Sequence, residues 1–153
     1  MVDIIIPRPD GTARVQEVYS PEFTVDREEL GPVQLKSKEN SSRSETRDVT
    51  VTQSLTLDAP IWAADAHISF HTEMSTASKS TNFEMSCRIG QVVEADTVHA
   101  SLKGNAWPLD CDYEKGSKRN GYYIEELRYF LVTHSESEFG MADFIIKSIE
   151  VER

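Results

Sequence analysis

Apolar and polar residues alternate along much of the chain, most regularly over residues 48–57. Apolar side chains fall mainly on one parity of this segment and hydroxyl side chains fill the other: Val49, Val51, Gln53, Leu55 and Leu57 against Thr50, Thr52, Ser54 and Thr56. Successive side chains of an extended strand point to opposite faces of a sheet. Strict alternation that is rich in β-branched residues therefore predicts a half-buried antiparallel strand.

Similar alternation or short apolar runs predict further strands, at residues 2–6, 13–19, 23–25, 33–35, 66–74 and 83–87, with less regular patterns at 92–93 and 97–102. Turn residues separate several of them, such as the two prolines and the Asp-Gly pair within residues 7–11. The acidic residues 26–29 are expected to divide two short strands. Residues 36–47 are polar throughout and predict an exposed loop or the start of a strand, and residues 103–121 predict an irregular connection.

The C-terminal third of the chain fits two interpretations. Residues 122–134 carry apolar side chains at both odd and even positions, as in a strand that is covered on both faces, but some of these positions also fit helical spacing. The apolar residues of 141–152 likewise fit either a strand or a helix. Periodicity alone does not distinguish the two for short apolar runs. Strands are favoured because the many short strands elsewhere imply a sheet that these segments would complete. The sequence thus predicts one all-β domain over residues 1–153, a two-sheet antiparallel β-sandwich of jelly-roll-like kind, with a closed β-barrel as the alternative.

The net charge of −10 narrows the range of partners. Recognition of nucleic acid relies on Lys and Arg at phosphates, so no nucleic acid and no anionic membrane surface is expected to bind. No apolar run is long enough for a transmembrane segment, and residues 1–9 do not resemble a signal peptide. We therefore expect a cytoplasmic protein, or a secreted one whose signal peptide has been removed. Exposed edge strands of an open sandwich would suit a homodimer.

Two cysteines, Cys87 and Cys111, allow one disulfide, which would close a loop of roughly 25 residues. Since nothing in the sequence indicates an oxidising compartment, two unpaired thiols are the favoured state. His67 and His71 have the spacing of a metal pair on a helix, but the alternation around them predicts a strand. In a strand they would be roughly 13 Å apart, too far to share an ion.

Three carboxylates near Cys111 are the basis of the only metal-site hypothesis that the sequence offers. Asp110, Asp112 and Glu114 stand at alternate positions before Gly116, as in the first half of a calcium-binding loop. The glycine comes one residue late, and Gly121 stands where an EF-hand has its bidentate Glu. An EF-hand is therefore excluded, and the choice lies between a looser calcium site and a solvated acidic turn.

Two tryptophans lie beside turn residues, Trp62 near Pro60 and Trp107 before Pro108. Such a tryptophan either packs in the core or offers its flat face to a ligand. The ligand hypothesis groups aromatic and polar residues of the same region: Trp107, Asp110, Asp112, Asn120, Tyr122 and Trp62.

Motifs of catalysis are absent from the sequence, including Gly-x-Ser-x-Gly, a Walker loop, the Rossmann glycines and His-Glu-x-x-His, so no catalytic residue is assigned. The sequence favours a non-catalytic, lectin-like module that binds a carbohydrate or small ligand through its loops. An acidic protein of the immunity or inhibitor type, which binds a basic protein partner, is the first alternative. An enzyme or a ligand-enclosing β-barrel is the second.

Overall fold

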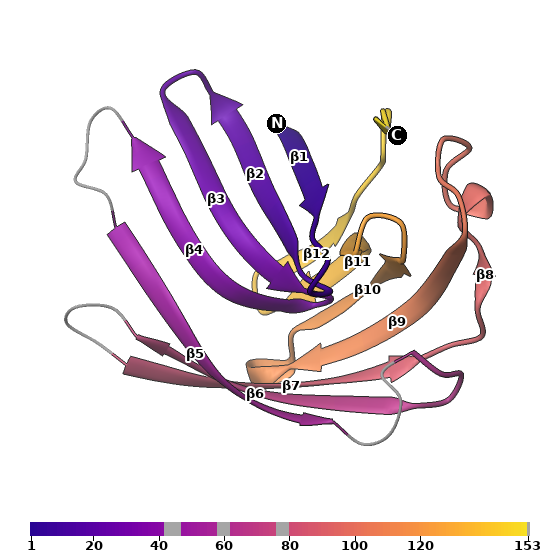
Figure 1. Cartoon of the computed structure of the whole chain (residues 1–153). Coiled ribbons are helices and arrows are strands. Elements are labelled where there is room, and N and C mark those ends of the chain that lie inside the picture. Colours follow the sequence, from indigo (N-terminus) through magenta and orange to yellow (C-terminus); the bar gives the residue numbers. More distant parts are fainter. Residues whose placement is uncertain (42–46, 58–61, 76–79, 153) are drawn as a thin grey trace. The chain divides into compact units, whose positions relative to one another are not determined.

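The computed structural model describes residues 1–41, 47–57, 62–75 and 80–152, and within this part of the chain the structure is all-β (Figure 1). Its strands are β1 (Val2–Pro7), β2 (Ala13–Ser20), β3 (Phe23–Leu30), β4 (Val33–Ser41), β5 (Arg47–Leu57), β6 (His67–Ser75), β7 (Ser80–Ile89), β8 (Val93–Glu94), β9 (Asn105–Tyr113), β10 (Lys118–Ile124), β11 (Tyr129–Ser137) and β12 (Gly140–Asp143). Two single-turn 3₁₀ helices, η1 (Ala95–Thr97) and η2 (Glu114–Gly116), complete the described elements. No helix among these residues is long or apolar enough to cross a membrane.

The strands pair in an open order, β1-β2-β3-β4-β5-β6-β7-β9-β10-β11-β12, with β8 paired to β9 beside this path. The predicted class, an antiparallel two-sheet sandwich, is confirmed, and no closed barrel forms among the described strands. Two compact units divide the chain. Unit 1 holds Met1–Ser54, His71–Phe83 and Leu127–Tyr129, and unit 2 holds Leu55–Phe70, Glu84–Glu126 and Phe130–Arg153.

Unit 1 contains the antiparallel meander β1 to β4, whose strands lie side by side in Figure 1. The register places Asp3 opposite Glu17, and Arg27 opposite Val15. Arg27 forms ion pairs with both Glu17 and Glu29 on the same face of the sheet. Burial and the neighbouring Glu17 raise the pKa of the Asp3 carboxyl above its usual value.

One sequence-based expectation for unit 1 is wrong. The acidic residues 26–29 do not divide two strands but lie inside β3. For residues 36–47 the sequence left open a loop or the start of a strand: residues 36–41 lie inside β4, Arg47 begins β5, and residues 42–46 lie outside the described residues. Charged side chains of neighbouring strands pair here: Asp26 with Arg14 at 3.1 Å, and Glu28 with Lys36 at 3.7 Å. Cross-strand pairs of opposite charge stabilise a sheet that lacks apolar alternation.

Unit 2 contains β9, β10, β12 and all of β11 except Tyr129, together with most of the buried core of the described residues, including Ile68, Ile89, Leu109 and Ile124. Residues 103–121 are therefore not irregular, since β9 and the start of β10 occupy most of them. The expected strand at 97–102 is absent, because η1 and turns lie there. The C-terminal segments adopt the favoured strand conformation only in part. Residues 122–134 contain two strands separated by a turn at 125–128, and residues 144–152 follow β12 without a strand.

A close backbone approach joins β10 to β11 at Gly121. A Cβ at this position would lie 2.1 Å from the carbonyl oxygen of Leu131. Real Cβ atoms do not come so near to a backbone atom, so glycine is required here for the two strands to pair.

The two cysteines form a disulfide, which corrects the expectation of unpaired thiols. Cys87 in β7 and Cys111 in β9 are directly opposite in the antiparallel register, with Cα atoms 4.1 Å apart. Both residues are buried. The pairing depends on the register of two strands that are not consecutive in the chain, and the sequence alone does not provide that register.

Candidate functional site

Three rows of side chains cross β7, β9 and β10 on one face of unit 2. Residues directly opposite each other in an antiparallel sheet share a face, so the register defines these rows. We call them together the polar face; they consist of Arg88, Asp110 and Asn120 in the middle row, Ser86, Asp112 and Lys118 in a second, and Gly90, Pro108 and Tyr122 in a third. The sequence-predicted residues Asp110, Asp112, Asn120 and Tyr122 are thus brought together.

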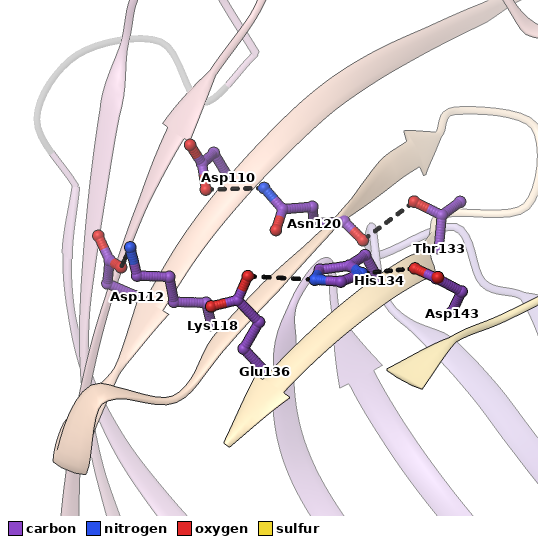
Figure 2. A network of polar contacts seen from close by, with 8 residues as sticks. All are labelled: Asp110, Asp112, Lys118, Asn120, Thr133, His134, Glu136 and Asp143. Carbon is purple, nitrogen blue, oxygen red and sulfur yellow. Dashed lines mark hydrogen bonds and ion pairs between the residues drawn. The ribbon is translucent and has the colours of Figure 1, made fainter. Parts of the chain in front are cut away.

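The middle row holds a carboxylate between two donors. Asn120 Nδ2 donates a hydrogen bond to Asp110 Oδ1 at 2.8 Å, and Arg88 Nη2 lies 3.4 Å from Asp110 Oδ2 (Figure 2 shows the bond to Asn120). The Arg88 and Asp110 side chains remain 64% and 48% exposed. The contacts therefore orient three planar polar groups that solvent, or a ligand, can reach.

The rows on either side differ in chemistry. Lys118 Nζ lies 3.9 Å from Asp112 Oδ1, and both side chains are more than half exposed. On the other side, the Gly90 N–H donates to the Pro108 carbonyl at 2.8 Å, and a Cβ at Gly90 would lie 3.1 Å from Pro108 Cβ. Glycine there avoids this clash, and the partly exposed Pro108 lies directly opposite the half-exposed Tyr122.

The polar contacts continue onto β11 and β12 (Figure 2). Thr133 Oγ1 donates to the backbone carbonyl of Asn120 at 3.3 Å. His134 Nδ1 lies 2.5 Å from Asp143 Oδ1, and His134 Nε2 lies 3.2 Å from Glu136 Oε1. The hydrogen bonds to Asp143 and then to Glu136 raise the pKa of the His134 imidazole above its usual value, because both carboxylates favour the charged ring.

Sequence reasoning missed the partners of His134. Glu136 was visible as its i+2 neighbour, which shares a face with His134 if the segment is a strand. Asp143 becomes its partner only through the β11–β12 register, in which His134 is directly opposite Asp143.

The two tryptophans do not belong to the polar face. Trp107 is three residues from Asp110 along β9, so its side chain points to the opposite face. There it is directly opposite Tyr123, and its Nε1 donates to Glu125 Oε1 at 2.8 Å. Trp62 stacks on the buried Tyr123, with ring centroids 3.7 Å apart and planes at 7°. Both tryptophans are therefore anchored by packing and hydrogen bonding, and the predicted six-residue ligand site is divided between two faces.

The predicted calcium ligands are likewise separated by their local contacts. Glu114 lies in η2, where its Oε1 accepts a hydrogen bond from the backbone N–H of Glu84 at 3.1 Å. Asp110 and Asp112 each face a cation on a neighbouring strand. Within the described ranges, no three His, Cys, Asp or Glu side chains are arranged to hold a metal ion.

His67 and His71 lie on β6, in the strand conformation that the sequence predicted, and both are exposed.

No family model, no curated protein and no solved structure matches the chain. Its function is therefore inferred from the chemistry of the polar face.

Proposed function

We propose that the protein is a non-catalytic binding module, and that it recognises a carbohydrate on the polar face. A sugar ring has an apolar face of C–H groups and an edge of hydroxyls that both donate and accept hydrogen bonds. Binding sites for such molecules combine aromatic or apolar surface with a few well-oriented polar groups. The polar face offers these in adjacent rows.

The middle row supports the proposal most strongly. Asp110 is held by Arg88 and Asn120 in one row, and Tyr122 lies on the same face one row away. Because its amide nitrogen bonds Asp110, Asn120 keeps its carbonyl oxygen as an acceptor and a second N–H as a donor. Arg88 keeps further guanidinium donors toward solvent. Side chains fixed by their neighbours lose little conformational entropy on binding.

A glycan array with the labelled protein tests the proposal, read in the presence of calcium and again with a chelator. We expect selective binding to a set of related glycans. Binding that the chelator abolishes would show that a metal ion takes part and would contradict the metal-free arrangement of the polar face, whereas binding that persists would remove calcium from the site. An array that stays blank in both conditions would contradict the carbohydrate proposal and favour the acidic interaction protein with a basic partner.

Two variants locate the site on the best glycan. Tyr122→Ala and Asp110→Ala should each weaken binding by roughly 5- to 150-fold, because each removes a contact worth on the order of 1–3 kcal/mol. Tyr19→Ala and Asp96→Ala are matched controls, since Tyr19 is 49% exposed and Asp96 is exposed, and neither lies on the polar face. Equal affinity for all four variants and the wild type would place the glycan elsewhere.

A further inference from the structure

Strand β1 stands at one end of the hydrogen-bonded strand order and pairs with β2. Among the described strands none pairs with its other edge, whose backbone N–H and C=O groups are therefore available to a further strand. Natural edge strands are commonly blunted by lysine, by proline or by a bulge. Strand β1 (Val-Asp-Ile-Ile-Ile-Pro) contains no lysine, its proline is its last residue, its only charged side chain is that of Asp3, and its register with β2 is regular.

An apolar stripe runs along one face of this edge strand. Val2, Ile4 and Ile6 alternate along β1, so their side chains share a face. They are 62%, 46% and 50% exposed. An exposed stripe of β-branched residues beside an unpaired backbone edge is the combination that natural proteins avoid unless another strand covers it.

We propose that β1 pairs with β1 of a second copy of this chain, antiparallel and across a twofold axis centred on Ile4. Val2 of each copy then lies opposite Ile6 of the other, and the two Ile4 side chains meet at the centre. All three apolar side chains of each copy contact apolar side chains, and the backbone groups of the edge gain partners. Such an isologous contact closes on itself and gives a dimer.

Charge and register favour this centre over its neighbours. A twofold axis perpendicular to the sheet leaves the same face of both copies on the same side. The alternative registers therefore differ only in which residue of β1 lies opposite its own copy at the axis. Centred on Asp3, the pairing would set two carboxylates directly opposite each other, which is destabilising. Centred on Ile5, it would place Pro7, which has no N–H, in the ladder and leave Val2 without a partner. Centred on Ile4, each Asp3 lies opposite an Ile5.

Single cysteines test the register directly, because Cys87 and Cys111 are joined to each other and leave no native thiol. Directly opposite residues have Cα atoms about 4.5–5.5 Å apart, within reach of a disulfide. Ile4→Cys should therefore form a disulfide-linked dimer under mild oxidation. Val2→Cys should not, since its two copies would lie roughly 13 Å apart along the strands. A mixture of Val2→Cys and Ile6→Cys should crosslink again. Failure of Ile4→Cys to crosslink, or equal crosslinking of Val2→Cys alone, would overturn the proposal.

Sedimentation of the unmodified protein tests the dimer itself. We expect a species of twice 17.3 kDa that dissociates on dilution. Ile4→Lys places a charge at the twofold centre and should leave a folded 17.3 kDa monomer. Ile145→Lys makes the same change at a residue that is 85% exposed and lies outside β1, and should stay dimeric. A wild-type monomer at all concentrations, or loss of the dimer in both variants, would refute the pairing. If Ile4→Lys fails to fold, crosslinking of the cysteine variants still tests the pairing. None of these positions lies on the polar face, so glycan binding is tested separately.

Discussion

Removal of the Cys87–Cys111 disulfide should lower the stability of the protein by a calculable amount. The two cysteines are 24 residues apart in sequence, so the bond closes a loop of about 25 residues. In the chain-entropy model, opening a loop of this length costs about 3.5 kcal/mol at 25 °C, because the unfolded chain regains that freedom. This corresponds to an increase of about 370-fold in the unfolding equilibrium constant.

Chemical denaturation measures this difference. The free energy of unfolding is compared for the wild type with and without reductant, and for the Cys87→Ala, Cys111→Ala double variant. Reductant should destabilise the wild type by about 3.5 kcal/mol and leave the double variant unchanged. The double variant should also lie below the oxidised wild type, with an added loss from the two buried sulfur atoms. A wild type that is insensitive to reductant, or that titrates two thiols when unfolded without reductant, would refute the reasoning.

Three further predictions concern single residues. Gly121→Ala should destabilise the fold by several kcal/mol, since its Cβ would lie 2.1 Å from a backbone atom of β11. Gly104→Ala should cost only about 1 kcal/mol, from its positive φ, because no atom lies within 4 Å of the new Cβ. Equal losses of stability in thermal melts of the two variants would contradict this contrast. His134 should titrate above 6.5 by NMR and move back toward that value in Asp143→Asn. Because the folded pKa is raised, the stability that this pair contributes is present below pH 6.5 and is lost as the pH rises through the folded value, so wild type and variant should converge in alkaline melts. Asp3→Asn should stabilise the protein at neutral pH, because the raised pKa indicates that the fold penalises the ionised carboxylate. This gain should vanish below about pH 3.8, and a neutral or destabilising effect at pH 7 would count against that penalty.

The sequence predicted strands well where alternation was regular and poorly where charge replaced it. Residues 13–19 and 83–87 alternate between apolar and polar side chains, and β2 and β7 lie there. Residues 36–41 show no such alternation, because β4 is stabilised in part by charged partners on β3, which a pattern along one strand cannot reveal.

The candidate site was predicted in part for a related reason. Asp110 and Asn120 were grouped correctly because they share one region of the chain, and β9 and β10 bring them opposite each other. Trp107 was grouped with them only because residues 103–121 were expected to be irregular, so no parity was applied. In a strand, its odd separation from Asp110 places it on the other face. The partners Arg88 and Asp143 come from other strands, and only the register identifies them.

Both tryptophans of the chain, Trp62 and Trp107, lie in unit 2. Their intrinsic fluorescence therefore reports on that unit alone, while far-UV circular dichroism reports on the strands of both. If the two signals change at the same denaturant concentration, the units unfold together and the single domain predicted from the sequence is cooperative. If the dichroism falls while fluorescence is still native, unit 1 unfolds first, and the two optical probes already separate its stability from that of the polar face.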